Sequence, residues 1–563
     1  MSAFQPIWIP PKNPPDSYHQ NLDRFPKAFR QVLFNRGFES PAAAESFLRS
    51  ADDLPDFDLP PDREDLLLRA VRESLAEDQS IMIYGDYDVD GITSAAMLHR
   101  ALQRIGARTE IYLPDRVEEG YGLHRSALKD IAASGVSLLI TVDCGIRAVS
   151  EVAYAKDLGL KVIVTDHHLP GDRLPPADLI LNPHLDGNPD HRILAGVGVV
   201  FLIVHALSTY FPTLDPDEYL DLAALGTVAD VVPLKSINRY LVRQGIRQLR
   251  NTRRQGLFSL IQVAGLDLGR ISAADISYQL APRLNAAGRL GEARTALNLI
   301  LADETKESGR LAQFLERLNS RRKQLTGLVV ETVEQNTGKV SPDTPLLFAV
   351  DPGFDQGVIG IAAGKLSRKY HRPVLIGQKL DELSVFSCRS IPEFNITAAL
   401  DTCQDLLLDY GGHPQAAGFK LANRNLVEFQ ERISAFAQSE LDGFPLTPRL
   451  QADAYARLET LNHRLLDYLK LLEPTGADNP RPVFWLERVR LTSIRRVGSG
   501  QNHLKCRVVQ GQDSLEGIGF YLGKEADQVP DQVDLLVEFG ENYFRGKAEK
   551  QVVILAIRNS SSA

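Results

Sequence analysis

Between residues 61 and 205, short apolar runs alternate with longer amphipathic stretches, and this alternation limits the possible folds more than any other feature of the sequence. Runs such as Leu138–Val142 have the length of a buried strand, whereas Ile92–Ile105 carries apolar residues at helical spacing. Strands separated by helices form βαβ units, which build a parallel sheet with helices on its faces. We therefore predict an α/β fold with strands at 80–85, 110–113, 138–142, 161–165 and 178–181, and with helices at 63–77, 92–105, 125–133 and 148–158.

Acidic side chains and imidazoles gather in four short segments of the first half of the chain. Each segment is expected to follow an apolar strand, and they read GDYDVDG (85–91), TVDCG (141–145), TDHH (165–168) and GTVAD (226–230). Because right-handed crossovers place the carboxyl ends of parallel strands along one edge of a sheet, these side chains are expected to meet there. Such a set suits a pair of divalent metal ions, which indicates metal-assisted hydrolysis of a phosphate ester.

The first of these segments, with Asp86, Asp88 and Asp90, has a competing interpretation as a calcium loop or a polar turn. Extended spacing would point its three carboxylates to one side, and Gly91 would free the backbone for a turn into the next helix. A calcium-binding EF-hand needs a helix on each side of its loop and a glutamate at the end of the loop. The strand expected before this loop favours the metal-hydrolase interpretation.

The later segments differ in their strength as evidence. A lone histidine is structural as often as it is a ligand, but His167 and His168 stand together directly after Asp166. Mixed aspartate and histidine ligands favour Mn²⁺ or Mg²⁺ over a closed structural zinc site. Asp143 belongs to the same pattern, whereas Asp230 is weaker evidence because GTVAD could also end a helix.

The length of the chain predicts about two to four domains, and its composition is that of a globular protein. Of the 563 residues, 44% are hydrophobic and 24% are charged, and no apolar run approaches the ~20 residues of a membrane-spanning helix. The N-terminus lacks the features of a signal peptide, so we expect a cytoplasmic protein without membrane association. The four cysteines are far apart and predict neither a zinc knuckle nor disulfides, and Cys144 is expected to be a small buried residue. The net charge of −9 argues against a protein that coats duplex DNA, although it permits a local basic groove.

The rest of the chain predicts three further parts. Residues 206–340 are mostly helical, and an apolar face from Leu311 to Val333 predicts one long connecting helix. Residues 345–440 predict a second α/β unit, with strands at 346–350 and 373–376 and helices at 359–370 and 396–410. After a stretch rich in Pro and Gly, five short strands predict a small β-barrel such as an OB-fold, at 483–490, 504–509, 515–521, 533–539 and 551–557.

Several arginines and glycines stand where a phosphate could be held. Arg116 follows the second predicted strand, Arg283 and Arg289 lie in APRLNAAGRL, and Arg389 lies in SCRS. Any one of them could be an ordinary surface ion pair, but several guanidiniums beside small residues suit bidentate phosphate contacts. The glycines of YGGH (410–413) would let backbone amides approach a phosphate, although a plain turn would look the same.

Two longer basic stretches are open to two interpretations. Each is either a solvated face or a surface for nucleic acid, and on barrel strands such charges suit single-strand binding together with stacking aromatics. The first stretch is expected to line one helix and contains Arg239, Arg243, Arg247, Arg250, Arg253 and Arg254. The second lies on the predicted barrel and contains Arg488, Arg490, Arg495, Arg496, Lys505 and Arg507.

Taken in order, GDYDVDG, TVDCG, TDHH and GTVAD resemble the successive motifs of the DHH phosphoesterase superfamily, which is named after the triplet at 166–168. APRLNAAGR, SCRS and YGGHPQAAG narrow the resemblance to the RecJ family of bacterial single-strand-specific exonucleases, over nearly the full chain. Two departures stand out. Tyr84 replaces a histidine found in many superfamily members, and Phe354-Asp355-Gln356 stands where a Trp-His pair is usual, which leaves the role of that loop open.

The resemblance implies an activity and a domain order. The activity would be a 5′→3′ exonuclease on single-stranded DNA that releases 5′-mononucleotides with two Mn²⁺ or Mg²⁺ ions, in DNA repair and recombination. The chain would be a monomer with a single-strand-binding protein and a helicase as partners. The expected parts are an N-terminal segment packed on the core (1–60), a parallel-sheet DHH domain (61–240), a helical connector (241–340), a smaller α/β DHH-associated domain (341–445) and an OB-fold domain that binds nucleic acid (446–563).

The resemblance also implies roles for individual residues. The metal ligands would be Asp86, Asp88, Asp90, Asp143, His167, His168 and Asp230, and Asp166 would orient a ligating histidine. Arg116, Ser387 and Arg389 would hold the 5′-phosphate. The DNA backbone would contact Arg283, Arg289, Gly411, Gly412 and His413.

Two alternatives from other functional classes remain open at this point. A phosphodiesterase for short oligonucleotides or cyclic dinucleotides would use the same core, but the predicted barrel and the expected 5′-phosphate residues favour the exonuclease. A non-catalytic DHH-type scaffold that binds DNA is disfavoured because every expected metal ligand is present.

Overall fold

The computed structural model describes residues 5–116, 119–338, 340–341, 343–498, 500–544 and 547–560. The chain forms two compact units. One unit comprises Glu45–Ser320 and Leu472–Pro480, and the other comprises Met1–Ala44, Arg321–Leu471 and Arg481–Ala563. Among the described helices, none combines the length and the apolar composition that are needed to cross a bilayer.

A five-stranded parallel sheet organises the first part of the unit that contains residues 45–320. Its strands are β2 (Ser80–Tyr84), β3 (Arg108–Tyr112), β4 (Val136–Thr141), β5 (Lys161–Thr165) and β6 (Leu179–Leu181), in the order β3-β2-β4-β5-β6. Tyr84 of β2 pairs with Thr141 of β4, and Thr141 pairs with Val164 of β5. The carboxyl ends of these three adjacent strands therefore lie side by side, as the alternation of strands and helices predicts.

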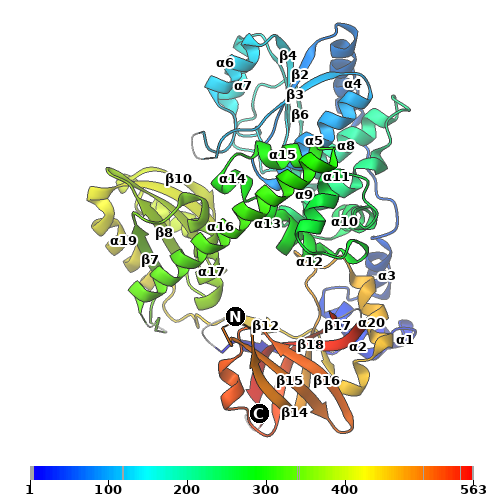
Figure 1. Ribbon diagram of the computed structural model, residues 1–563, viewed down its shortest axis with the longest axis vertical. Coiled ribbons are helices and arrows are strands. Elements are labelled where there is room, and N and C mark those ends of the chain that lie inside the picture. Colours follow the sequence, from blue (N-terminus) through cyan, green and yellow to red (C-terminus); the bar gives the residue numbers. More distant parts are fainter. Residues whose placement is uncertain are drawn as a thin grey trace. The chain divides into compact units, whose positions relative to one another are not determined.

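Helices cover both faces of this sheet, and Figure 1 shows the layers. Ile81 and Ile83 share one buried cluster with α4 (Pro61–Ala76), α5 (Val89–Arg104) and α8 (Gly196–Ser208). Met82 and Tyr84 share another with α6 (Arg125–Ala133) and α7 (Val149–Asp157). Successive strand residues point to opposite faces, so a continuous apolar run fits a strand that is buried on both sides. Cys144 is fully buried in the second cluster, as predicted.

The predicted helical region follows the sheet. One long helix, α16 (Thr305–Thr337), has 33 residues, and the division between the two units falls within it. The shorter helices pack on the first core cluster and are α9 (Leu220–Ala229), α10 (Ser236–Leu249), α11 (Gln255–Val263), α12 (Ala273–Asp275), α13 (Ala281–Leu284), α14 (Ala287–Leu290) and α15 (Arg294–Leu301).

The arginine stretch at 239–254 does not form one solvated face of a single helix, because α10 ends at Leu249 and several of the arginines bond to other parts of the fold. Arg239 is fully buried, donates from Nη1 to the Leu472 carbonyl at 2.7 Å, and lies 4.1 Å from the centre of the Phe47 ring. Other members are bonded as well: Arg243 to the Glu473 carbonyl, Arg247 to Asp52, Arg250 to the Ile271 carbonyl and Arg254 to Asp221.

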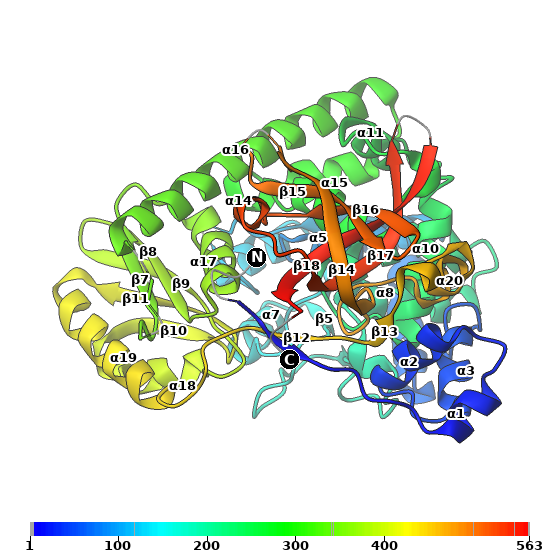
Figure 2. The same cartoon turned by 90° about the horizontal axis from the view of Figure 1, so that it is seen from below.

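A second α/β sheet lies in the other unit. Its strands are β7 (Leu347–Asp351), β8 (Val374–Lys379), β9 (Leu383–Arg389), β10 (Leu407–His413) and β11 (Ala416–Ala422), in the order β10-β11-β9-β8-β7. Helix α17 (Gln356–Tyr370) and helix α19 (Leu426–Glu440) cover opposite faces, as Figure 2 shows. The helix predicted at 396–410 is wrong in its second half, because α18 (Ile396–Asp401) is short and the chain then forms the edge strand β10.

The C-terminal residues form the predicted barrel. Its five strands are β14 (Val483–Val497), β15 (His503–Gln510), β16 (Asp513–Gly519), β17 (Val533–Phe544) and β18 (Lys547–Asn559). The order β14-β15-β16-β18-β17 is closed by pairing of β14 with β17, and the short β13 (Ala454–Ala456) adds in parallel to β14. Closure removes the exposed sheet edges, which stabilises a small β domain. Acidic neighbours neutralise part of its basic surface, since Arg507 bonds to Glu516 and Arg496 to Asp527.

The N-terminal segment divides between the two units. Phe57 packs in the core of the parallel-sheet unit, 5.1 Å from the Phe201 ring. The earlier part belongs to the other unit, where β1 (Ile7–Ile9) pairs in parallel with β12 (Arg449–Gln451) and Arg36 lies 3.5 Å from Asp453. The remaining helices are α1 (Asp16–Asn21), α2 (Lys27–Asn35), α3 (Pro41–Arg49) and α20 (His463–Leu469).

Candidate metal centre

Three of the four acidic segments begin where adjacent parallel strands end. They follow β2, β4 and β5, so the sheet itself brings Asp86, Asp143 and Asp166 to one edge. Asp143 has a positive φ of 61°, a conformation that is uncommon outside glycine and that often marks a functional site. The fourth segment differs from the prediction, because Asp230 follows a helix, α9, and forms its C-terminal cap.

The first acidic loop turns directly into α5, so its carboxylates do not alternate along an extended chain as predicted. Asp88 caps the N-terminus of α5, and its Oδ1 accepts from the backbone N–H groups of Asp90 and Gly91 at 2.9 and 3.2 Å. Asp90 is in the first helical turn. The turn divides the carboxylates between two neighbouring groups: Asp86 and Asp88 lie with Asp143, whereas Asp90 belongs to another group.

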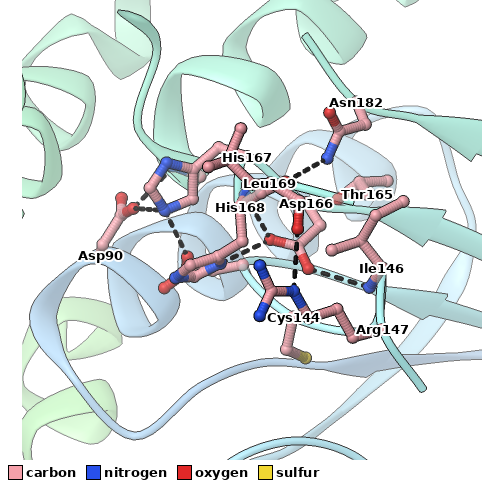
Figure 3. Close-up of polar contacts among 12 residues, drawn as sticks. Asp90, Cys144, Ile146, Arg147, Thr165, Asp166, His167, His168, Leu169 and Asn182 are labelled. Carbon is pink, nitrogen blue, oxygen red and sulfur yellow. Dashed lines mark hydrogen bonds and ion pairs between the residues drawn. The ribbon is translucent and has the colours of Figure 1, made fainter. Parts of the chain in front are cut away.

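His167 stands at the centre of the site. Its Nδ1 lies 3.1 Å from the Leu194 carbonyl, which can only accept, so Nδ1 carries the proton. The other ring nitrogen, Nε2, therefore presents its lone pair to the carboxylates, 3.2 Å from Asp143 Oδ1, 3.7 Å from Asp230 Oδ2 and 3.9 Å from Asp90 Oδ2. Figure 3 shows His167 turned toward Asp90.

Asp166 orients the second histidine. Its Oδ1 accepts from His168 Nδ1 at 2.7 Å and from the His168 backbone N–H at 3.0 Å, while Oδ2 accepts from the Ile146 N–H at 2.9 Å. Figure 3 shows this carboxylate between the imidazole and Ile146. Because both oxygens are used in this way, Asp166 fits a role in holding His168 rather than in direct ligation.

The N-terminus of α8 also belongs to the site. Gly196 and Val197 donate their backbone N–H groups to the two oxygens of Asp90 at 2.6 and 2.9 Å. A helix N-terminus favours a negative charge, so this contact fixes a carboxylate that is 1% exposed. This contact was not predicted from the sequence, in which its signal is the glycine-rich start of an apolar helix in AGVGVVF (195–201).

The carboxylates repel one another strongly when no cation is present. Burial and the neighbouring carboxylates raise the pKa of Asp90 to about 7 and the pKa of Asp230 to about 9. The same causes hold the pKa of Asp86 and of Asp143 well above the usual range. Burial lowers the pKa of His167 to about 4, so its imidazole is neutral at physiological pH and can act as a ligand.

The residues fit a pair of divalent cations. Three groups each offer three ligand atoms within 4.8 Å of one another, and they comprise Asp143-His167-His168, Asp90-His167-Asp230 and Asp86-Asp88-Asp143. Asp86 Oδ1, Asp143 Oδ1 and His167 Nε2 are buried without a hydrogen-bond partner among the described residues. Buried polar atoms normally have a partner, and oxygen with imidazole nitrogen is a donor set that Mn²⁺ and Mg²⁺ accept.

Tyr121 is a further residue at the site that the sequence analysis did not identify. Its hydroxyl lies 3.2 Å from the Asp143 carbonyl and 3.2 Å from His168 Nδ1, and its side chain is half exposed. It belongs to a loop after β3, and no strand or helix pattern marks it in the sequence.

Three family models match this chain. The model of the DHH family, N-terminal domain, matches residues 80–227, the DHHA1 domain model matches 343–439, and the RecJ OB domain model matches 452–556. The single-stranded-DNA-specific exonuclease RecJ of Bacillus subtilis is 35% identical over 531 residues, which cover 93% of this chain and 67% of that protein. The chain belongs to the RecJ family.

Solved structures of the RecJ family agree with this assignment. The crystal structure of RecJ in complex with Mn²⁺ from Thermus thermophilus has a TM-score of 0.84 at 30% identity and covers 98% of this chain and 79% of that chain. The structure of RecJ in complex with Mg²⁺ from the same organism has a TM-score of 0.78 at 29% identity and covers 98% and 78%, respectively.

In this RecJ family member, one of the predicted DNA-binding arginines lies beside the first acidic loop. The guanidinium of Arg116 is 5.0 Å from the centre of the Tyr87 ring. The segment that contains Arg289 braces the same loop, since Asn285 Oδ1 accepts from the Val89 N–H at 3.2 Å and a Cβ at Gly288 would lie 2.7 Å from the Tyr87 carbonyl oxygen.

Arg283 has a different environment from the other predicted DNA contacts. Its side chain is 6% exposed, and it donates to Glu316 Oε2 at 2.5 Å and to the Gln279 carbonyl at 2.7 Å. The bond to Glu316 holds α13 to α16, and both bonds favour a structural role for this arginine over a contact with DNA.

The remaining predicted contacts lie on the second sheet. Ser387 and Arg389 are on β9, and a Cβ at Gly360 of α17 would lie 3.4 Å from Ser387 Oγ and 3.3 Å from Arg389 Nη2. The two side chains thus share one place beside α17. Gly411, Gly412 and His413 are exposed on the edge strand β10, so the competing interpretation of this segment as a plain turn is wrong.

Proposed function

We propose that this protein hydrolyses single-stranded DNA from its 5′ end and releases 5′-mononucleotides, with two divalent metal ions at the candidate metal centre. As a RecJ family member it is a metal-dependent exonuclease that acts on single-stranded DNA, which fits roles in DNA repair and recombination. The proposal rests mainly on the environment of His167 Nε2. This atom is buried, has no hydrogen-bond partner among the described residues, and faces three carboxylates.

The side chains divide into two ligand groups. Asp86, Asp88 and Asp143 would hold one ion, and Asp90, His167 and Asp230 would hold the other, with His168 next to Asp143. When bound, such ions neutralise charge on the phosphodiester and lower the pKa of a water molecule, which are the two requirements of phosphate-ester hydrolysis.

The surrounding groups keep this arrangement rigid. The Leu194 carbonyl fixes the tautomer of His167, and Asp166 does the same for His168. The start of α8 holds Asp90. Positioning within a fraction of an ångström matters, because phosphoryl transfer depends more on orientation and charge than on covalent chemistry.

Digestion of end-labelled single strands tests the proposed polarity. With MnCl₂, a 5′ label is expected to appear first as a labelled mononucleotide, whereas a 3′ label is expected to pass through a ladder of shortening strands. Early release of the 3′ label would show the opposite polarity. Equal cleavage of duplex and single strands would contradict the strand specificity.

Arg389 is proposed to recognise the 5′-phosphate together with Ser387 of the same strand, β9. Replacing Arg389 with glutamine is expected to reduce the preference for 5′-phosphorylated over 5′-hydroxyl strands by about 10- to 100-fold, since a charge-assisted hydrogen bond contributes about 1.5–3 kcal/mol. Competition between the two strands measures this ratio. Arg432→Gln is the control, because Arg432 lies in the same unit and bonds to Asp405 at 2.8 Å. If Arg389→Gln keeps the same preference for 5′-phosphorylated strands, Arg389 does not contact the 5′-phosphate.

The proposal also includes the DNA and protein partners of this chain. The barrel would bind the DNA strand through exposed rings such as Phe520 and Tyr521 together with exposed arginines such as Arg488. A helicase and a single-strand-binding protein would supply the single-stranded substrate, and the protein would act as a monomer.

A further inference from the structure

Asn238, on α10, is a buried residue that the catalytic proposal does not use. Its side chain is fully buried, and its Nδ2 donates to two backbone carbonyls, those of Ile193 and of Pro233, the latter at 3.1 Å. Carbonyl oxygens only accept, so only the NH₂ end of the amide can face them. The Asn238 amide thus bridges the two carbonyls, and this bridge depends on the two N–H donors of one small planar group.

One end of the bridge leads to the groups that hold His167 and Asp90. Ile193 is followed directly by Leu194, whose carbonyl orients His167 at 3.1 Å. Two residues further along, α8 begins and donates its first N–H groups to Asp90. A shift of the Ile193 carbonyl would therefore move both an imidazole and a carboxylate.

The other end leads to Asp230. Pro233 lies three residues after that carboxylate, between two residues with positive φ, Val231 at 64° and Ser236, the first residue of α10, at 43°. A β-branched residue with positive φ costs free energy, so such a turn persists only where its surroundings hold it. The hydrogen bond from Asn238 to the Pro233 carbonyl is one contact that stabilises this turn.

We propose that Asn238 is a positioning residue for the metal centre, which ties the segment that carries the supports of His167 and Asp90 to the segment that carries Asp230. This inference rests on the proposed two-metal function. It assigns no direct contact with metal or DNA to Asn238. Its effect is to set the distance between ligands that come from separate parts of the chain.

The chain contains a matched control for this residue. Asn479 is 2% exposed, and its Nδ2 also bridges two carbonyls, those of Leu472 and Pro474, at 2.8 and 2.7 Å. Neither carbonyl adjoins a residue of the metal centre. Asn238→Leu and Asn479→Leu therefore each remove two bonds to backbone carbonyls of the same unit, but only Asn238→Leu removes bonds to carbonyls that lie next to ligand-bearing segments. The bonds that join the Asn479 loop to α10 and its approach, from Arg239 to the Leu472 carbonyl and from Leu234 to the Ala477 carbonyl, stay in both variants.

Calorimetric titration of the metal-free, full-length variants with MnCl₂ tests the inference. Asn238→Leu is expected to weaken Mn²⁺ binding by about 10- to 100-fold, as loss of an outer partner of a ligand does, whereas Asn479→Leu should stay within about threefold of the unaltered protein. Both variants should lose thermal stability to a similar degree. At saturating MnCl₂, the turnover of Asn238→Leu should recover most of its loss.

Asn238→Asp provides a second variant of nearly the same volume. It places a carboxylate against two carbonyl oxygens. If the leucine variant does not fold, the Mn²⁺ affinity of Asn238→Asp tests the inference in its place. Unchanged Mn²⁺ affinity in a folded Asn238 variant, or an equal loss in Asn479→Leu, would overturn the inference. If the unaltered protein binds Mn²⁺ but does not cleave DNA, the proposed function fails while the positioning role of Asn238 stands.

Discussion

Replacing Asp143 with asparagine is expected to lower the rate of DNA hydrolysis by about 10³-fold or more, because a carboxylate that serves metal-ion catalysis contributes several kcal/mol. The same change is expected to raise the melting temperature of the metal-free protein by about 2–4 °C at pH 8. Burial and the surrounding carboxylates raise the pKa of Asp143, so its ionised form is destabilising when no cation is present. A residue that reduces stability in order to serve catalysis is typical of functional sites.

A matched control separates this effect from a general loss of structure. Asp221 is also a buried aspartate, at 2% exposure, but it pairs with Arg254 at 2.9 Å and lies outside the metal-ligand groups. Asp221→Asn is expected to keep activity at moderate temperature and to lower the melting temperature. Single-turnover cleavage and calorimetry in EDTA measure both quantities. Normal cleavage by Asp143→Asn would place the reaction at another site.

The parallel sheet was predictable because its signals are local. Strand β5 and helix α6 have the predicted bounds, and the ends of the other strands of the sheet differ from the prediction by at most two residues. Apolar runs of strand length between amphipathic helices have few other solutions, and the handedness of the crossovers then determines the edge at which the acidic segments meet. The central position of His167 follows from that edge.

The errors arose where a short segment depends on distant contacts. Asp230 ends a helix, and it reaches the centre because α9 packs against α5 and α8, which no local pattern shows. The glycines at 411–412 look like a turn, but pairing with β11 makes them part of a strand. Arg239 has the sequence environment of an exposed helix, yet it donates a hydrogen bond to the Leu472 carbonyl, more than 200 residues away in the chain.

The support of the metal ligands could not be predicted for the same reason. Backbone groups orient several of the ligands by hydrogen bonds. The Leu194 carbonyl orients His167, and the first N–H groups of α8 orient Asp90. Backbone donors and acceptors are present at every residue, so the sequence does not show which of them will be used. Side chains that serve as ligands are therefore easier to predict than the groups that orient them.

The metal-free protein is expected to lose stability as the pH rises from about 6 to about 9, and divalent metal ions should reverse this loss. Burial and neighbouring carboxylates raise the pKa of Asp90 to about 7 and of Asp230 to about 9, against about 3.9 in the unfolded chain. Between these values the folded state holds protons that the unfolded state has released. The free energy of unfolding then falls with pH, by about 1.4 kcal/mol per pH unit for each extra proton, until the pH passes the folded pKa.

Calorimetry in EDTA and in MnCl₂ across this range measures the effect, and Asp230→Asn is the control. His167 does not mask it, because burial lowers the pKa of His167 to about 4 and the ring is neutral in both states above about pH 7. Removing the group with the higher pKa should flatten the fall between pH 7 and 9. In MnCl₂ the cations replace the protons, so the affinity of the unaltered protein for Mn²⁺ should rise with pH. A metal-free melting temperature that rises between pH 7 and 9, or an equal slope in Asp230→Asn, would mean that these carboxylates do not repel one another and that the metal centre is not assembled before the ions bind.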